Sequence, residues 1–175
     1  MYSLFKRLWY KHAFRNATDT LPNFSLDGYK GWAKIVNVYD GDTFRACVYI
    51  HDRVLKFTFR PLGYDAPEMK PRLDTPNRET HKKNAVIARE LFKEYTGYNS
   101  EYSMKPGCCF VCTAKPNGLV YLECFKNDKY GRTLVNVYRY PGGKSVNDMM
   151  IDSGLVLRYD GKTKAEFNYT EQLKK

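Results

Sequence analysis

The sequence predicts one α+β domain built mainly from β-strands. Three runs of alternating apolar and polar residues between 32 and 60 predict strands, and apolar residues at helical spacing predict a helix over 78–95. A chain of 175 residues with 43% hydrophobic content can fill one compact core but not two. We therefore expect one domain over 31–161, preceded by an extension over 1–30 and followed by a short tail or truncated helix over 162–175.

The first predicted element is an antiparallel meander. Its runs WAKIVNVY, TFRACVYI and VLKFTFR are separated by the turn-prone segments DGD and HD. In the third run, Phe57 and Phe59 share one face of the strand, whereas Lys56, Thr58 and Arg60 share the other. Arg60 is therefore expected on a polar face near the end of the meander.

A loop and a helix are predicted next. Pro67, Pro71 and Pro76 exclude a helix or an interior strand from DAPEMKPRLDTPN, and Thr75 with Pro76 provides a helix start. Five apolar residues then share one helical stripe: Ala85, Ala88, Leu91, Phe92 and Tyr95.

The second half of the chain predicts three more strands and a short helix. The runs CCFVCTA and LVYLECF flank the turn KPNG, and TLVNVYRY follows the polar loop KNDKYGR. Ser145 with Asp148 has the form of a capping box, which opens a helix that ends at Gly154.

The charge balance favours a polyanionic partner. Lysine and arginine number 29, and aspartate and glutamate 19, which gives a net charge of +10. Such a positive field attracts nucleic acid, our first candidate, or an anionic membrane surface. Many basic proteins nevertheless bind nothing specific, so charge is informative only beside a site.

The cysteines favour a reducing, intracellular compartment. Their number, five, is odd and does not suit a disulfide framework. Cys109 and Cys112 have the CxxC spacing of a zinc knot, with Cys124 further along. Residues three apart in a strand point to opposite faces, however, so buried thiols are favoured over zinc in CCFVCTA.

Residues 1–17 are basic and carry apolar residues at helical spacing. Lys6, Arg7, Lys11 and Arg15 occur there without an acidic residue. An organelle import presequence, an amphipathic helix on a membrane and an arm packed on its own domain all fit this pattern. We favour the packed arm, with the apolar face of residues 4–14 covering the barrel. The sequence contains no apolar run of about 20 residues, so we expect no membrane-spanning helix.

Four carboxylates are expected at one end of the meander. Asp40 and Asp42 lie in its first turn, and Asp65 and Glu68 follow its third strand. Clustered carboxylates raise one another's pKa unless a cation neutralises them, and a hard divalent ion is their natural ligand. Taken alone, DGD is also an ordinary hairpin turn with solvated aspartates.

Taken together, these motifs resemble the staphylococcal nuclease family over roughly residues 32–160. The matching pieces, in order, are DGDT at 40–43, FR at 59–60, DAPE at 65–68, DKYGR at 128–132, and VN followed by GL at 146–147 and 154–155. The resemblance implies a five-stranded Greek-key barrel of the OB type with two or three packed helices.

The family's activity would make this chain a nuclease that hydrolyses phosphodiester bonds in DNA or RNA. Little sequence preference and 3′-phosphate products would follow from the same resemblance. Asp40 and Asp65 look like ligands of a calcium ion, with the backbone carbonyl of Ala66 as a third oxygen and Asp42 alongside. Calcium, with its flexible coordination, is favoured over magnesium or manganese.

The resemblance also implies the catalytic roles. Glu68 would deprotonate the attacking water, and Arg60 and Arg132 would grip the scissile phosphate. Attack on a phosphodiester builds negative charge on the phosphoryl oxygens, and arginine can donate two hydrogen bonds to one phosphate. Three further residues look like those near the terminal phosphate and base: Lys129, Tyr130 and Tyr159.

The chain departs from the family pattern in three places. Pro61 directly after Arg60 is unusual in a strand, Ala66 replaces a threonine, and only TEQLKK remains of a last helix. The alternative function is a barrel that binds nucleic acid without cleaving it. All six site positions are retained, which favours the enzyme. We expect a monomer without a stable protein partner.

Overall fold

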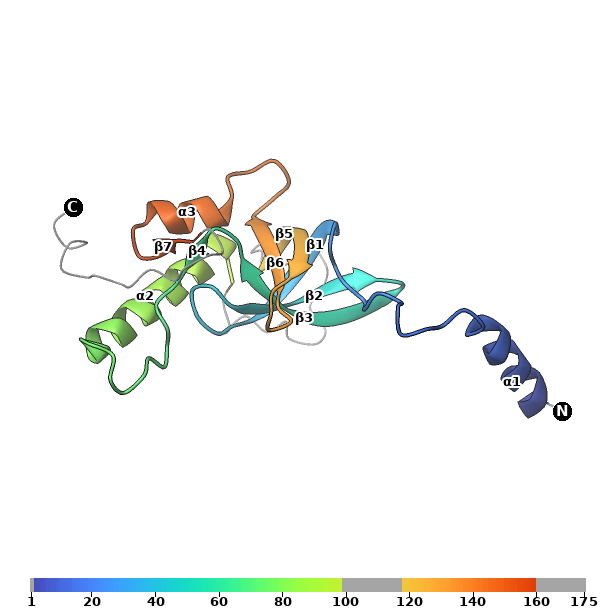
Figure 1. Cartoon of the computed structure of the whole chain (residues 1–175). Helices are drawn as coiled ribbons and strands as arrows, with labels where there is room; N and C mark the ends of the chain where they lie inside the picture. Colours follow the sequence, from blue (N-terminus) through green and yellow to red (C-terminus); the bar gives the residue numbers. More distant parts are fainter. Residues whose placement is uncertain (1, 99–117, 160–175) are drawn as a thin grey trace.

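The computed structural model describes residues 2–98 and 118–159 and contains a closed five-stranded barrel (Figure 1). Around the barrel the strand order is β1-β2-β3-β6-β5. The strands span Lys30–Val38 (β1), Phe44–Ile50 (β2), Arg53–Pro61 (β3), Leu119–Asn127 (β5) and Thr133–Tyr138 (β6). Two short strands, β4 (Tyr64–Asp65) and β7 (Leu157–Arg158), form a separate antiparallel pair. The predicted fold class, mainly β with a closed OB-type barrel, is confirmed.

The barrel closes through pairings between distant strands. Neighbouring barrel strands are antiparallel except β3 and β6, which run parallel, with Arg60 beside Leu134. A parallel pair needs a long crossover, and α2 (Arg78–Thr96) lies on that connection. Pro61 is the last residue of β3, where a missing N–H donor is tolerated. The next N–H, that of Leu62, donates to the carbonyl of Val135 at 2.9 Å.

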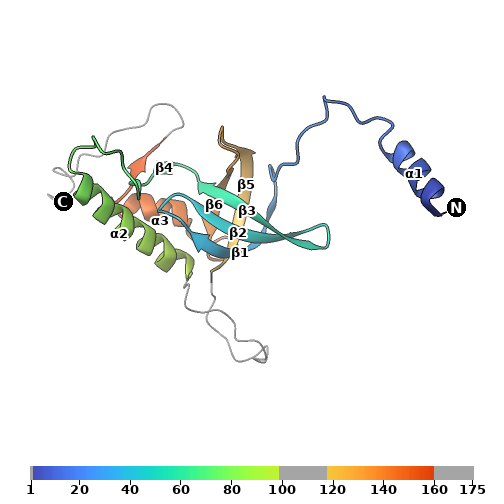
Figure 2. The same ribbon diagram turned by 90° about the horizontal axis from the view of Figure 1, so that it is seen from below.

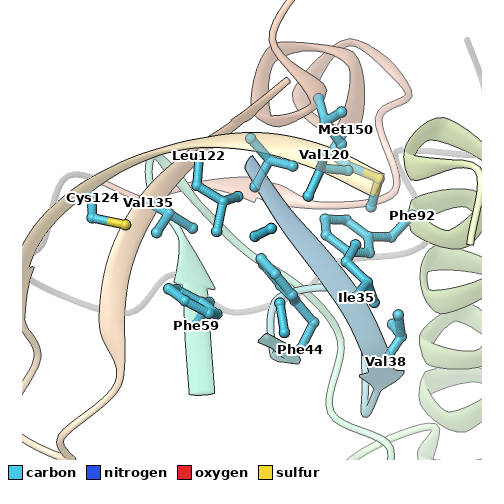
Figure 3. Packing of buried hydrophobic residues seen from close by; sticks show 14 of the residues in the cluster. Ile35, Val38, Phe44, Phe59, Phe92, Val120, Leu122, Cys124, Val135 and Met150 are labelled. Carbon is cyan, nitrogen blue, oxygen red and sulfur yellow. The ribbon is translucent and has the colours of Figure 1, made fainter. Parts of the chain in front are cut away.

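Strand alternation builds the core in Figure 3. Ala33 and Ile35 point inward from β1, and the register shifts between Ile35 and Asn37. A bulge adds one residue to one strand, so the inward-facing residues change from odd to even sequence numbers after Ile35. Val38 is accordingly buried. The buried ring of Phe44 lies with its centroid 5.4 Å from that of Phe59 in the barrel and 5.4 Å from that of Phe92 in α2, and so joins the barrel to the helix.

Helix α2 covers one end of the barrel. It begins at Arg78, after Asn77 with φ of 52°, rather than at the predicted Thr75 and Pro76. Gly97, with φ of 66°, ends it and donates to the carbonyl of Glu94, because a left-handed residue commonly closes a helix. The predicted helical stripe is confirmed, since all five of its residues belong to the core or pack against it.

Helix α3 (Val146–Asp152) is attached to the barrel by one buried amide. Ser145 caps the helix by accepting from the N–H groups of Asn147 and Asp148. The side-chain amide of Asn147 donates to the carbonyls of Leu62 and Val135 at 3.0 Å each, and its oxygen accepts from the N–H of Val137 at 3.0 Å. These bonds connect α3 to the segment after β3 and to β6 through backbone groups, one of which, the Val135 carbonyl, also accepts from Leu62.

Helix α1 (Tyr2–Ala13) lies away from the barrel in both views (Figures 1 and 2). Its apolar residues are exposed, so the hypothesis that this arm covers the barrel is wrong. No helix among the described residues is long and apolar enough to cross a membrane. The CxxC segment and TEQLKK lie outside the described residues.

Removing the buried amide of Asn147 is expected to destabilise the protein. Asn147→Ala removes the partner that Asn147 provides to the Leu62 carbonyl and to the Val137 N–H, and one of two donors to the Val135 carbonyl. The free energy of unfolding should therefore fall by about 2–4 kcal/mol. Denaturant unfolding followed by circular dichroism measures this change. Asn37→Ala, which removes an exposed amide on β1, is the control and should cost no more than about 1 kcal/mol. Equal losses in the two variants would contradict the role given to Asn147.

Candidate active site

The DGDT loop is held against α2 and the segment after β3. A Cβ on Gly41 would lie 2.9 Å from the Cβ of Ala66 and 3.1 Å from that of Ala88, so only glycine fits this approach. The buried hydroxyl of Tyr64 donates to the carbonyl of Gly41 at 2.8 Å. The loop between β1 and β2 is thereby fixed beside the residues that follow β3, as expected from a curled meander.

Arg60 joins the carboxylates of these two segments. Its Nη1 lies 2.8 Å from Oδ2 of Asp42, and its Nη2 forms an ion pair with Asp65. The Nη2 also donates to the carbonyl of Tyr64 at 3.4 Å. The three side chains are only 12%, 10% and 7% exposed, in the order Arg60, Asp42, Asp65. Burial would lower the pKa of Arg60, but Asp42 and Asp65 outweigh it and raise the pKa.

Asp42 forms bonds within its own loop and to the segment after β3. Its Oδ1 accepts from the hydroxyl of Thr43 at 2.9 Å, and its Oδ2 accepts from the N–H of Ala66 at 3.1 Å. Asp40 lies behind it and accepts from the N–H of Asp42 at 3.1 Å. Asp42 is therefore the direct link between the two segments, and Asp40 supports the loop.

The surroundings of Asp40 disfavour its charged form. Burial, followed by the nearby charge of Asp42, raises the pKa of Asp40 to about 7. A cation near Asp40 and Asp42 would offset both effects. Asp42 and Asp65 present the hard oxygen donors that calcium or magnesium prefers, so these residues fit a hard divalent cation. Among residues 2–98 and 118–159, no three histidine, cysteine or acidic side chains by themselves form a metal-binding group.

The second predicted arginine is held at the same loop. Asp128 accepts from the N–H groups of Tyr130 and Arg132 at 2.9 Å each, and from Nε of Arg132 at 2.7 Å. Arg132 then donates through Nη1 to the hydroxyl of Thr43 at 3.0 Å. Thr43 also contacts Asp42, so one short chain of bonds connects Arg132 to the carboxylate that Arg60 neutralises.

The remaining predicted residues lie further out. Glu68 is exposed and follows the buried Pro67. Lys129 Nζ and Arg132 Cζ lie 5.1 and 5.6 Å from the ring centroid of Tyr130, which is itself exposed. Tyr159 is half-buried beyond β7, where its N–H donates to the carbonyl of Gly63 at 3.0 Å. The structure thus joins the two predicted arginines, the three predicted aspartates and Asp128 into one network, with Tyr130 at its edge.

Three residues of this network were not predicted: Thr43, Tyr64 and Asp128. Thr43 and Asp128 stand inside the motifs DGDT and DKYGR, so the motifs carried a signal for them. Tyr64 gave none, because it is one of 15 tyrosines and its contact with Gly41 spans 23 positions.

Comparison with known proteins identifies one family. The model of the family described as staphylococcal nuclease homologue matches residues 59–175, more than half of the chain. The match includes Arg60, Asp65, Glu68 and Arg132, whereas the DGDT loop precedes it. No curated protein matches the chain. The DGDT loop lies outside the matched range, but the structure places it in contact with Arg60 and Arg132, which lie inside that range.

The bonds of Asp128 predict a pH-dependent stability. Burial would raise the pKa of Asp128, but hydrogen bonds from the backbone and side chain of Arg132 outweigh it and hold the pKa below its usual value. A lowered folded-state pKa contributes stability above the unfolded pKa, about 4, and this contribution is lost as the pH falls through the folded value. Asp128→Asn should therefore have a lower melting temperature than the wild type at pH near 7. The difference between the two melting temperatures should narrow below pH of about 4.

Thermal unfolding from neutral to acidic pH measures this gap. Asp152→Asn, which removes an exposed carboxylate paired with Lys144, is the control and should change stability little at neutral pH. A gap for Asp128→Asn that stays constant down to acidic pH would show that its carboxylate charge does not stabilise the Arg132 turn.

Proposed function

We propose, because this chain belongs to the staphylococcal nuclease homologue family, that it is a nuclease that hydrolyses phosphodiester bonds in DNA or RNA. The observation that carries the proposal is the position of Arg60, which holds Asp42 and Asp65 together while Arg132 is fixed to the same loop through Thr43. Positive charge and hard oxygen donors thus adjoin one another, as phosphoryl chemistry requires.

The two arginines would bind the scissile phosphate. Attack on phosphorus places additional negative charge on its oxygens, and fixed guanidinium groups stabilise that charge without reorganising. Arg132 is preorganised by Asp128, and Arg60 by the carboxylates on either side. Both remain charged at any working pH, so the phosphate site does not depend on a proton.

Glu68 would accept the proton of the attacking water. Its side chain is exposed to solvent, three residues after Asp65, at the end of a segment held by the buried Ala66 and Pro67. The proposed role of this carboxylate is to take a proton from a water bound beside the arginines. By family analogy, the reaction would leave a 3′-phosphate.

Calcium is the proposed cofactor. Asp40 and Asp65 are the proposed ligands, with the backbone carbonyl of Ala66 as a third oxygen and Asp42 alongside. Arg60 holds Asp42 and Asp65 at this position. When bound, the ion would polarise a phosphoryl oxygen and lower the pKa of a coordinated water. A cation bound there would favour the charged form of Asp40, whose pKa is raised by burial and by the charge of Asp42.

The exposed ring of Tyr130 is proposed to contact the nucleic acid beyond the scissile phosphate. Lys129 and Arg132 lie over its ring at 5.1 and 5.6 Å. A base could stack on this ring because every base offers a π-face, and the cations would contact the backbone. Neither interaction reads base identity, which agrees with the proposed lack of sequence preference. Tyr159, near β4, is a second candidate for this region.

Removing the proposed base or the second arginine is expected to slow cleavage. Glu68→Gln and Arg132→Ala should each lower kcat on single-stranded DNA by roughly 10²-fold, because each removes one group preorganised for the transition state. Matched controls are Glu79→Gln, an exposed glutamate on α2, and Arg53→Ala, an exposed arginine in the β2–β3 hairpin. Both should retain wild-type turnover.

Two results would overturn the assignment. Near-normal turnover of Glu68→Gln or Arg132→Ala would remove that residue from the mechanism. Tight binding of DNA or RNA by the wild type without cleavage would leave a nucleic-acid-binding barrel, the alternative function.

A further inference from the structure

Helix α1 presents a large apolar surface that nothing in the described chain covers. Leu4, Phe5, Leu8 and Trp9 are 62%, 70%, 54% and 64% exposed. The helix lies beyond the barrel in two perpendicular views (Figures 1 and 2), with exposed residues 14–25 between them. Contiguous apolar patches of this kind commonly mark interaction sites.

The helix has two chemically distinct faces. At about 100° per residue, Leu4, Leu8, Phe5 and Trp9 fall in that angular order along one half of the helix. Lys6, Arg7 and Lys11 fall on the other half, and Arg15 follows the helix. No acidic residue occurs in α1. Tyr10 also falls on the basic half, and His12 falls on the apolar half. An apolar face opposite a mainly cationic face is the pattern of helices that lie in a membrane interface.

A lipid surface can bind both faces of α1 at once, whereas a second copy of α1 or a nucleic acid would bind one face. Two copies of α1 packed through their apolar faces would bring basic residues close together without acids to neutralise them. Nucleic acid would neutralise the basic face but leave the aromatic face in water. The anionic surface of a bilayer offers phosphates to the lysines and arginine, and an apolar boundary to the other face.

We propose that α1 binds the surface of an anionic lipid bilayer, with Phe5 and Trp9 inserted at the headgroup boundary and Lys6, Arg7 and Lys11 against lipid phosphates. The helix has 12 residues, or about 18 Å at 1.5 Å each, which is too short to span a hydrocarbon core of about 30 Å. It therefore lies along the surface. Tryptophan suits such a boundary because its ring is apolar and its N–H is polar.

The placement of α1 leaves the candidate active site accessible. Helix α2 and β4, which adjoin that site, lie on the opposite side of the barrel from α1 (Figure 1). The chain joins the barrel at the buried Leu26, and the N–H of Gly28 donates to the carbonyl of Cys124 at 3.0 Å. A barrel tethered through residues 14–25 can therefore act on nucleic acid while α1 is bound.

Vesicle co-sedimentation of the full chain tests the proposal. Vesicles of phosphatidylcholine with phosphatidylserine should bind the protein, and those of phosphatidylcholine alone should bind it much more weakly. Each basic residue near an anionic surface strengthens binding by about fivefold, so Lys6→Glu with Lys11→Glu should weaken it by about 30-fold or more. Phe5→Ser with Trp9→Ser should abolish sedimentation. The control is Tyr140→Ser, an exposed aromatic residue on the barrel, which should bind as the wild type does.

Fluorescence reports on insertion directly. In a Trp32→Phe background, Trp9 is the remaining tryptophan, and its emission should shift to shorter wavelength with anionic vesicles. The proposal is overturned if the wild type binds neither vesicle, if the Phe5 and Trp9 double variant binds undiminished, or if the helix only dimerises the protein. Nuclease activity of the α1 variants is measured beside the wild type, so failure of the proposed function leaves the vesicle result independent.

Discussion

The candidate site depends on one buried interaction, the neutralisation of Asp42 and Asp65 by Arg60. These carboxylates come from two segments of the meander, and without a cation between them their repulsion and desolvation would push the segments apart. The parallel pairing of β3 and β6 places Arg60 beside Leu134. Leu134 follows Arg132 by two residues. Barrel closure therefore brings both arginines to the same loop.

The residues around this interaction are small and pack closely, which restricts the movement of the loop. Gly41 packs against Ala66 and Ala88, and the hydroxyl of Tyr64 holds the loop carbonyl. Loops that carry chemistry need such support, since a shift of about 1 Å can cost 10²-fold in rate. The mainly apolar barrel thus positions polar groups that would be solvated and mobile in an isolated hairpin.

Local patterns in the sequence predicted local structure well. Alternation over 32–60 and helical spacing over 78–95 correspond to β1–β3 and α2. Barrel closure was implied by the family resemblance and not by alternation, because pairing between β1 and β5 or β3 and β6 leaves no periodic signal. The motifs predicted residues that the structure brings together, among them Arg60, Asp65 and Arg132. The contact of Tyr64 with Gly41 and the Arg60 bridge are tertiary and could not be predicted from local patterns. Helical spacing likewise predicted α1 without showing whether it packs.

The most direct test of the account is cleavage of single-stranded DNA by the purified protein, with calcium and then with excess chelator, beside Asp65→Ala. Cleavage that requires calcium and is lost in Asp65→Ala is expected if the carboxylates held by Arg60 form the reaction centre. Cleavage that persists in chelator, or in Asp65→Ala with calcium, would contradict that centre and place the chemistry elsewhere.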